Sequence, residues 1–475
     1  MPLRRSFLGT LCSGALVLSG CGYRESDEYG ASSDEPVATD DAAEETVTPT
    51  PTPPDGNSDD TESNTSDTDS DSDQSSDEEP LDIRDFGAAI DGKTDDTHAV
   101  RAAVRSAEAG DTILFPAGTT FVSPAKVEER SAIILDRNEI PPNLTLAGRG
   151  RGSVIRMEGT DILSPSVITL VGKGSFGGLE IRDLRIDGNR SEQLVEGGHG
   201  IRSGREPDEP IPADVRIRNV WVENCNQTGI SLRHGGVLLD RCTVQDCTKH
   251  GISLGLSDHI TGNPPRVVVR RSYCTRNGKA GAGVTYGINC SAGNILVEDC
   301  VCENNAQGTK TTAAGVEVRY RRVRLANNDI WGYIRAGGDT TDRTHVVFED
   351  VVAVGNEGGG VRLSRDTDYS VPTELLASEN MGTNVRVAND ARITGERIWS
   401  NRAKGAYGIL AESSATGRIE YYHPYLNETG PVNGDGDIQL VHVDEADKTD
   451  IDGVPTARDV GAGTEPPGDE SLEPI

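Results

Sequence analysis

The sequence lacks the features that mark several common classes of protein. The apolar run near its start covers only Leu11 to Leu18, well short of the roughly 20 residues that cross a bilayer as a helix. Positive charge is scarce, with 46 Lys and Arg against 77 Asp and Glu, and no basic face emerges. We therefore expect no membrane helix and no nucleic-acid partner. No CxxC pair stands at the spacing of a zinc site.

The first residues read as a targeting segment. The RR pair at 4–5, followed by FL, resembles a twin-arginine export signal, and LSGC at 18–21 resembles a lipobox. We expect residues 1–21 to be a signal peptide whose cleavage leaves Cys21 as a lipid-modified N-terminus. The expected location is the extracellular face of the cytoplasmic membrane.

Two segments lack the large apolar residues that a folded core needs. Residues 22–80 consist mostly of Asp, Ser, Thr, Glu and Pro, and 444–475 repeat that composition. Such chains cannot bury enough apolar surface to offset their chain entropy, so we expect a disordered linker and a disordered acidic tail. The remaining 81–443 has 47 acidic and 41 basic residues, so most of the net charge of −31 sits in these ends. With only 8 Lys against 38 Arg, the composition resembles that of halophilic proteins from haloarchaea.

Residues 81–443 contain an internal repeat. A seven-residue template, such as NVWVENC at 219–225, recurs at intervals of 21 to 30 residues. A short minimum period with variable insertions is typical of a solenoid whose loops absorb the extra length. Leucine-rich repeats are the rival solenoid, but their fixed Leu spacing is missing. The last template position forms a column of Cys225, Cys247, Asn277, Asn305, Asn328, Asn356, Asn380 and Asn401.

The chemistry of this column predicts the fold. Most members are followed four residues later by Gly and then by an alternating strand such as ISL, so Asn marks a tight bend between two strands. Stacked Asn side chains can hydrogen-bond from coil to coil at a spacing of about 4.8 Å. We expect an all-β fold, a single-stranded right-handed parallel β-helix of about 10–12 coils.

The cysteines follow the same register. Cys225 and Cys247 share a column on adjacent coils, as do Cys274 and Cys302, and the coil spacing lies within the Cα range of a disulfide. Buried reduced thiols that act as small apolar filler are an equally good interpretation. The sequence leaves this choice open.

The start of the repeat domain carries a family resemblance. The string DIRDFGAAIDGKTDDTHAVRAAVRSA at 82–107 resembles the opening of the pectate-lyase-like superfamily. Asp95-Asp96-Thr97 would start a short amphipathic helix that covers the open end of the β-helix. The resemblance implies the same fold and a carbohydrate substrate, but a fold alone does not fix the reaction.

Two histidines could carry chemistry. His199 in GGHGIRSG and His250 in TKHGISLG are in register two coils apart, about 10 Å from each other. Both strings are similar to the Gly-His-Gly segment of polygalacturonase-type hydrolases. Thr228 has the same frame without His, and the Asp-Asp pair and Asn-Thr-Asp string of those hydrolases do not precede either histidine. A hydrolase mechanism is therefore disfavoured.

A lyase needs a base for the proton beside a uronate carboxylate, and a cation to neutralise that carboxylate. Strand alternation predicts one long outward face that mixes His, Arg and carboxylates. We expect His250 or His199 as base, and Arg319 and Arg362 as carboxylate clamps. Asp258 and Glu317 are candidate metal or sugar ligands, with calcium the conceivable ion. The expected substrate-binding residues are Arg202, Arg233, Asp258, His259, Glu317, Arg365 and Asp366.

Together these features predict an exported, lipid-anchored protein that acts on an extracellular acidic polysaccharide, with β-elimination ahead of hydrolysis or epimerisation. The alternative is a non-catalytic surface protein that binds glycan or stiffens the envelope. The sequence does not indicate an oligomeric state.

Overall fold

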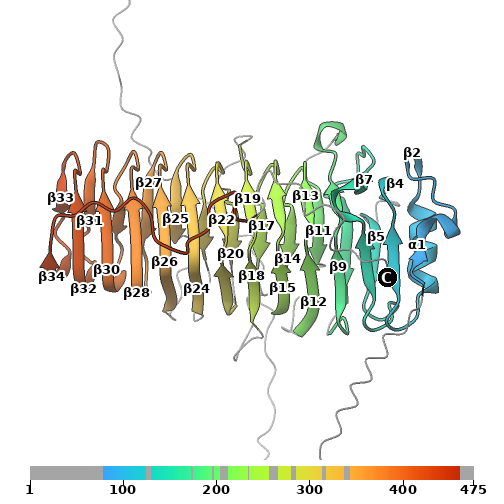
Figure 1. The fold of residues 1–475 in the computed structure, drawn as a ribbon, viewed down its shortest axis with the longest axis horizontal. Helices are drawn as coiled ribbons and strands as arrows, with labels where there is room; N and C mark the ends of the chain where they lie inside the picture. The colour runs from blue at the N-terminus through green and yellow to red at the C-terminus, as the bar shows by residue number, and fades with distance from the viewer. Residues whose placement is uncertain are drawn as a thin grey trace, which may run out of the picture. The chain divides into compact units, whose positions relative to one another are not determined.

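The computed structural model describes residues 79–124, 130–172, 175–194, 197–203, 212–233, 235–255, 266–279, 285–291, 293–312, 317–335 and 343–460. Within these ranges the chain forms one elongated parallel β-helix, whose strands lie side by side along its length (Figure 1).

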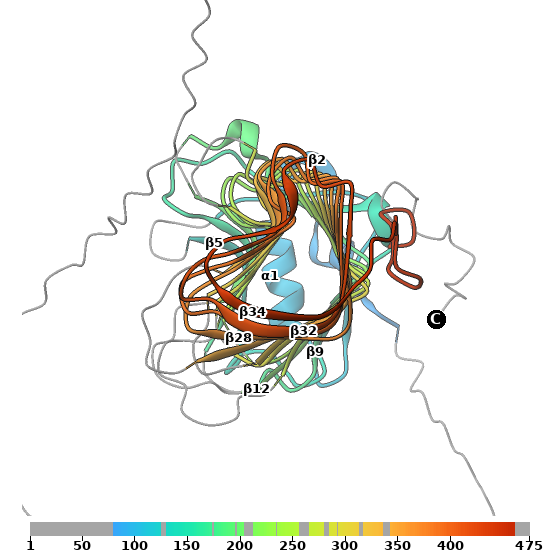
Figure 2. The same cartoon turned by 90° about the vertical axis from the view of Figure 1, so that its left-hand side faces the viewer.

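A short helical cap covers the N-terminal end. Strand β1 (Leu81–Asp82) leads through a 3-10 turn (Ile83–Phe86) and β2 (Asp91–Asp95) into α1 (Thr97–Ser106). The helix buries Ala99, Val100, Ala103 and Val104, and it lies across the N-terminal end of the coils when they are viewed end on (Figure 2). The predicted capping helix is therefore confirmed. Its N-cap residue, Asp96, turns its carboxylate away from the helix and accepts the backbone N–H of Ala89 at 2.7 Å.

Twelve strands of one parallel sheet give the number of coils. Each strand pairs with the equivalent strand of the next coil, which confirms the expected β-helix of about 10–12 coils. The strands of this twelve-stranded sheet are β5 (Ser131–Asp136), β8 (Ser166–Val171), β11 (His199–Ser203), β14 (Ile230–Leu232), β17 (Ile252–Leu254), β20 (Ile288–Cys290), β23 (Thr309–Thr311), β25 (Trp331–Arg335), β27 (Gly359–Leu363), β29 (Val385–Val387), β31 (Tyr407–Ala411) and β33 (Gly430–Asn433).

The other wall of each coil is a 22-stranded sheet with two legs. The first leg holds β1, β3 (Thr112–Phe115), β6 (Thr145–Gly148), β9 (Leu179–Arg182), β12 (Pro212–Arg218), β15 (Gly235–Asp240), β18 (Val267–Arg270) and β21 (Ile295–Glu298). The second leg holds β2, β4 (Gly118–Val122), β7 (Ser153–Met157), β10 (Arg185–Asp187), β13 (Trp221–Glu223), β16 (Thr243–Gln245), β19 (Tyr273–Thr275) and β22 (Val301–Glu303). Later coils join both legs in single bent strands, which are β24 (Glu317–Ala326), β26 (Thr344–Val354), β28 (Thr367–Ser378), β30 (Arg392–Asn401), β32 (Thr416–Tyr425) and β34 (Asp437–Val443).

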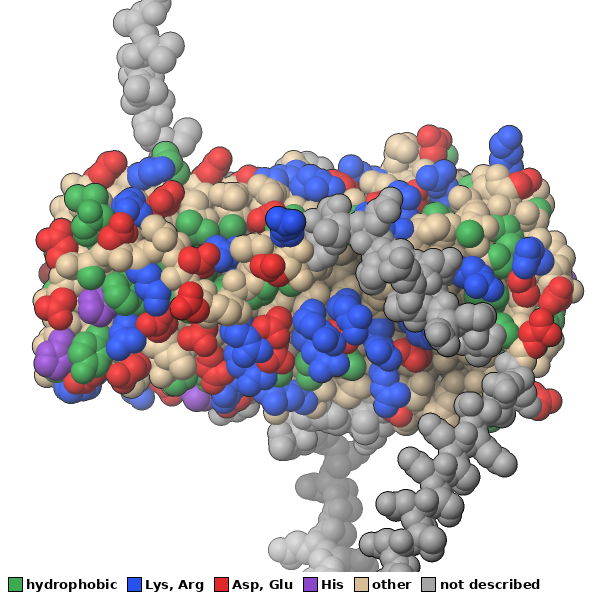
Figure 3. Space-filling view, viewed as in Figure 1, with side chains coloured by type: hydrophobic (Ala, Val, Ile, Leu, Met, Phe, Trp, Pro, Cys, Tyr) green, Lys and Arg blue, Asp and Glu red, His purple; other side chains and the backbone are tan. Residues whose placement is uncertain are grey.

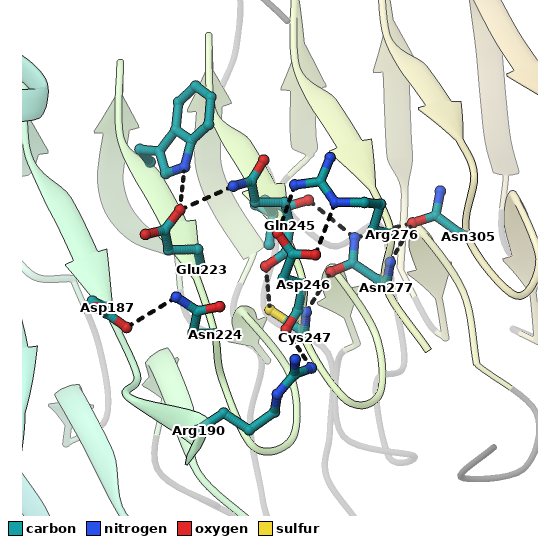
Figure 4. A network of polar contacts seen from close by, with 12 residues as sticks. Asp187, Arg190, Glu223, Asn224, Gln245, Asp246, Cys247, Arg276, Asn277 and Asn305 are labelled. Atoms are coloured by element: carbon teal, nitrogen blue, oxygen red, sulfur yellow. Dashed lines mark hydrogen bonds and ion pairs between the residues drawn. The ribbon is translucent and has the colours of Figure 1, made fainter. Parts of the chain in front are cut away.

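An asparagine ladder fixes the corner between the second leg and the twelve-stranded sheet. Asn277 donates its backbone N–H and its side-chain amide to the Asn305 Oδ1, each at 3.0 Å (Figure 4). Asn305, Asn328 and Asn356 repeat this pattern to the next coil. Each amide also donates to a carbonyl one coil back, as Asn356 does to Leu325 at 3.0 Å. The residue before each ladder position adopts a left-handed conformation, which turns the chain through the corner. The predicted ladder is confirmed from Asn277 to Asn380.

The ladder ends differently from the prediction. Asn401 pairs in register with Ser378, two positions before the ladder corner, and it donates to the Lys448 carbonyl outside the coil at 2.6 Å. Asn384 takes the ladder onward, because its Oδ1 accepts from Asn380 and its amide donates to Asn427 at 3.3 Å. Placing Asn401 in the column was therefore wrong. A shift of two residues leaves each side chain on the same face of the strand, because side chains alternate with a period of two. The seven-residue template therefore matches equally well in the shifted register.

All seven cysteines of the β-helix are buried free thiols. Cys274 and Cys302 face each other in register on adjacent coils, as expected, without a bond between them. Burial raises the pKa of Cys242 and of Cys290 to about 12. Such thiols are unreactive apolar filler at neutral pH, because the thiolate is the reactive form.

The expected disordered tail does not begin at residue 444. Residues 444–460, here called the C-terminal strap, lie along the second leg of the 22-stranded sheet (Figure 1). Ile451 and Val454 are buried against Val352 and Leu376, and Arg324 binds Asp450 at 2.6 Å. The acidic composition of this segment predicted disorder. Two apolar residues and a few ion pairs nevertheless hold the extended chain on an apolar patch of the sheet.

Charged side chains of both signs cover the face that carries the strap, and Lys and Arg gather at its lower middle, over β12 to β24 (Figure 3). At the edge between the two legs, arginines pair with acids of the neighbouring coil, as Arg271 does with Asp240 and Arg322 with Asp299 at 2.6 Å. These pairs follow the coil repeat and link adjacent coils. In the part of the chain that the structure describes, no helix has the length and apolar character to span a bilayer.

Candidate functional site

One outward column of the twelve-stranded sheet brings cations and small polar side chains together. Strand pairing places the residue after one inward-facing position of each strand in line from coil to coil. Because coils are about 4.8 Å apart, the column forms a continuous strip, which is polar except at the buried Ile334. In order along the helix it reads Arg202, Ser231, Ser253, Asn289, Lys310, Ile334, Arg362 and Arg386.

His250 lies at the edge of this strip and is held by the next coil. Its ring stacks on Tyr286 with the centroids 5.4 Å apart, and its Nδ1 accepts the Tyr286 backbone N–H at 3.2 Å. Neutral His250 therefore carries its proton on Nε2. Burial, with Lys310 and Lys249 nearby, lowers the pKa of His250 to about 4. Such a histidine is a weak base at neutral pH, because a general base works best with a pKa near the working pH.

His199 occupies the equivalent position two coils earlier, as the repeat predicted. Burial, with Arg202 and Lys249 nearby, lowers its pKa to about 3. The side chain is only 8% exposed, so it offers little access to a substrate. Both histidines fit filler roles in the corner better than the role of a base.

These two pKa values predict a loss of stability in acid. Each folded-state pKa lies below the ordinary value of 6.5, so between these values the unfolded chain binds more protons than the folded one. As pH falls from about 6.5 to about 4, His250 alone should cost about 3 kcal/mol, at about 1.4 kcal/mol per pKa unit. We expect the difference in urea midpoint between about pH 7 and about pH 4.5 to shrink in the double variant His199→Gln/His250→Gln. Exposed His442→Gln is the control, and an unchanged pH response in the double variant would contradict the assignment.

Lys310 is the titratable group of the strip that is best placed for chemistry. Its ammonium lies 5.2 Å from the centre of the Tyr286 ring. Burial, with Arg335 and Arg365 nearby, lowers the pKa of Lys310 to about 8. A lysine with such a pKa can act as a cation or as a base near neutral pH.

Trp331 adds an aromatic surface to the same sheet. A side chain at Gly359 would place its Cβ 2.2 Å from the Trp331 Cζ3, so the indole lies against the backbone of the next coil and requires glycine there. The ring stays partly exposed, and the apolar face of a sugar can pack on such a surface. Its position three residues before Ile334 puts it about 10 Å along the strand from the Lys310 position.

The predicted site residues divide among several places. Arg202 and Arg362 lie in the strip, and Arg233 follows β14 with its backbone N–H on the Ser203 Oγ at 2.9 Å. Arg365 and Asp366 lie in the turn between β27 and β28, where Asp366 meets Arg343 at 3.4 Å. The remaining predicted residues, Asp258, His259 and Cys21, lie outside the described residues.

Glu317 and Arg319 correct the prediction of a single long face. Both lie on β24 and pair with β21 and β26 in the first leg of the 22-stranded sheet, away from the strip. Alternation correctly predicted that these side chains point outward. Each coil, however, has three outward faces, one on the twelve-stranded sheet and one on each leg of the 22-stranded sheet, and alternation does not distinguish them. The same ambiguity hid Lys310 and Trp331, whose strands were not assigned to a wall.

Among the residues described, no group of three His, Cys, Asp or Glu side chains is placed to hold a metal ion. Calcium therefore stays a prediction from the sequence.

Comparison with known proteins defines the class. A family model described as "Right handed beta helix region" matches residues 177–319 and 229–370. The A-module of the mannuronan C-5 epimerase AlgE6 of Azotobacter vinelandii superposes with a TM-score of 0.61 at 17% identity, over 78% of this chain and all of that module. The protein is thus a right-handed parallel β-helix, as the sequence predicted.

Curated relatives are more similar over shorter stretches. Alginate lyase 7 of Azotobacter vinelandii is 36% identical over 121 residues, 24% of this chain, and the mannuronan C5-epimerase AlgE6 of the same organism is 35% identical over 148 residues, 30% of this chain. The matched stretches span only 14% and 15% of the length of those two proteins.

Proposed function

We propose that this protein is polysaccharide-active and acts on an acidic, uronate-containing glycan by β-elimination at the strip of the twelve-stranded sheet. The observation that carries the proposal is the placement of Lys310 and Arg362 two coils apart in one outward column, with the Trp331 ring on the strand between them. Arg202 extends the same column of cations four coils toward the N-terminus. Cations beside an aromatic platform suit a sugar that bears a carboxylate.

Each step of the elimination has a group in the strip. The Arg362 guanidinium, two coils or about 10 Å from the Lys310 position, pairs with the uronate carboxylate and stabilises the negative charge that develops when the neighbouring carbon loses its proton. Arg202 lies four coils from Lys310 and binds the carboxylate of another sugar along the chain. The neutral amine of Lys310 takes that proton. The bond from the next carbon to the glycosidic oxygen then breaks, and the departing oxygen receives a proton from the Lys310 ammonium or from water. The product is a sugar with a carbon–carbon double bond next to the carboxylate.

The named relatives support this chemistry. An alginate lyase and mannuronan C5-epimerases are among the proteins that this chain is similar to. Elimination and epimerisation both start with the loss of the proton beside the carboxylate, and they differ in whether the proton returns to the ring. The cations of the strip and these names support the proposal of an acidic substrate.

A second candidate is a non-catalytic glycan-binding protein. His250 uses its Nδ1 for a backbone contact, and the strip from Arg202 to Arg386 contains no carboxylate that could serve as an acid. The same cations and the same indole would bind an acidic chain without cleaving it.

We also propose that the protein is exported and anchored by lipid at Cys21, on the support of the RR pair at 4–5 and LSGC at 18–21. A tether rich in Asp and Ser would then hold the β-helix at the extracellular face of the cytoplasmic membrane, where extracellular polysaccharide is available.

The test is a screen of the full chain on polymannuronate, polyguluronate and polygalacturonate in high salt, with and without calcium. Ultraviolet absorbance of the unsaturated uronate reports elimination, reducing ends without absorbance report hydrolysis, and proton exchange from deuterated water into the polymer reports epimerisation. We expect absorbance on at least one uronate polymer. Binding of a polymer with no product of any kind would overturn the lyase and favour the second candidate.

A further inference from the structure

A second cluster of reactive side chains lies on the first leg of the 22-stranded sheet, away from the strip. Glu317, His345 and Ser370 come from the adjacent strands β24, β26 and β28. Glu317 and His345 are paired in register, and Ser370 is paired with the residue two positions after His345. All three point outward, and His345 is 46% exposed.

The three side chains stand in the order of a nucleophile, a base and an orienting acid. The Ser370 Oγ lies 3.1 Å from the His345 Nε2, and the Glu317 Oε2 lies 3.7 Å from the His345 Nδ1. The first distance is a hydrogen bond, and the second is an ion-pair contact that strengthens when the imidazole gains a proton. This is the geometry that lets a serine hydroxyl act as a nucleophile.

Neighbouring charges hold the glutamate in place. Arg319 donates to the Glu317 Oε1 at 3.2 Å, which leaves the Oε2 to face the histidine. Arg319 is itself fixed by Glu349 at 2.5 Å. Glu317 is thus a positioning residue that keeps the imidazole oriented with its Nε2 toward Ser370.

A groove adjoins this cluster toward the N-terminal coils. It encloses about 340 Å³ and combines three guanidinium groups with an amide and an apolar patch. On the other side of Ser370, Thr394 of the next coil presents a hydroxyl at the register position about 4.8 Å away. The groove is lined by Arg266, Asn294, Leu296, Glu317, Arg319 and Arg321.

We propose that Ser370, His345 and Glu317 form an ester-hydrolysing site that removes acyl groups from an acidic saccharide. The groove arginines bind the carboxylate of the sugar, and the ester lies over Ser370. The choice of an acidic saccharide rests on the proposed function, whereas ester cleavage by this cluster does not.

The reaction balances with water as the second substrate. The Ser370 Oγ bonds to the ester carbonyl carbon while its proton passes to the His345 Nε2, and Thr394 donates to the oxygen that becomes negative. The ester C–O bond breaks, and the sugar hydroxyl leaves with the proton from His345. Water, deprotonated by His345, then cleaves the acyl-serine and releases the acid, which restores the serine.

The experiment uses the full chain and an activated ester, p-nitrophenyl acetate, so it does not depend on any glycan. We expect hydrolysis above the buffer rate, and labelling of Ser370 by a fluorophosphonate probe located by mass spectrometry. Ser370→Ala and His345→Gln should lose the enzymatic rate by at least about 100-fold. Glu317→Gln should lower kcat and alter the pH profile while KM changes little, because it acts through the imidazole.

A matched control lies farther along the same sheet, past the bend between the two legs. His442 faces Glu420 at 3.9 Å and stacks on Tyr421 instead of meeting a serine, so His442→Gln should keep the full rate. Arg266→Gln should raise KM for an O-acetylated uronate polymer, because Arg266 is one of the groove arginines. Equal rates in Ser370→Ala and wild type, or labelling at serines other than Ser370, would overturn the site. That result would leave the β-elimination proposal untouched, because no glycan enters this assay.

Discussion

Replacing Asn356 by alanine is expected to lower the free energy of unfolding by about 2–6 kcal/mol. The Asn356 Oδ1 accepts the backbone N–H and the side-chain amide of Asn328, and its own amide donates to the Leu325 carbonyl. Alanine leaves the Asn328 backbone N–H and the Leu325 carbonyl without partners, and each unsatisfied buried group costs about 1–3 kcal/mol. The Asn328 amide keeps its bond to the Cys302 carbonyl at 3.2 Å. Asn356 has ladder members on both sides, so the chain ends cannot relax around the gap.

The measurement is urea denaturation followed by circular dichroism. Asn138→Ala is the control, because Asn138 is exposed in a turn and should change stability by less than about 0.5 kcal/mol. Asn356→Ala within about 1 kcal/mol of wild type would show that the ladder contributes little net stability, with water replacing the lost bonds.

The fold could be predicted from the sequence because its signals repeat. The ladder from Asn277 to Asn380 recurs at a short period, and each member has the same local reason to be there, a buried amide at a left-handed corner. Repetition turns a weak local preference into a strong pattern. The opening string predicted α1 equally well, since an open β-helix end must be covered.

Other features depend on contacts between distant segments and left no such pattern. The strap binds through Ile451 and Asp450, and its composition resembles that of a disordered tail until the apolar strip beneath it is known. Asn401 resembled a ladder member because a slip of two residues preserves the alternation.

Only some residues of the candidate site could be predicted from the sequence, because the properties of the others depend on how the coils pack. His250 and His199 were found through a short string, but their burial and the backbone bond to the His250 Nδ1 depend on the coils packed around them. Lys310 shows no motif at all, and its low pKa arises from burial next to arginines that follow it by 25 residues or more.

Changing Lys310 should have the largest effect on activity. Lys310→Gln removes the proposed base and one cation, and we expect elimination to fall by a factor of about 100–10,000, the usual contribution of a positioned general base. Lys310→Arg keeps the charge, but a guanidinium holds its proton at all working pH values. The arginine variant should therefore bind the polymer nearly as well as wild type and still lose turnover, so kcat falls while KM stays close.

The pH dependence provides an independent check of the same group. The active form of Lys310 is the neutral amine, so turnover by wild type should rise with pH and level off above the pKa of about 8. High pH favours the base but removes a cation from the strip, so polymer binding should weaken over the same interval. If kcat rises and affinity falls around the same pKa, and neither change occurs in Lys310→Arg, then the Lys310 amine is both the base and a binding cation. Exposed Lys404→Gln is the control for charge alone. Turnover within twofold of wild type in Lys310→Gln would remove Lys310 from the mechanism and leave the strip as a binding surface.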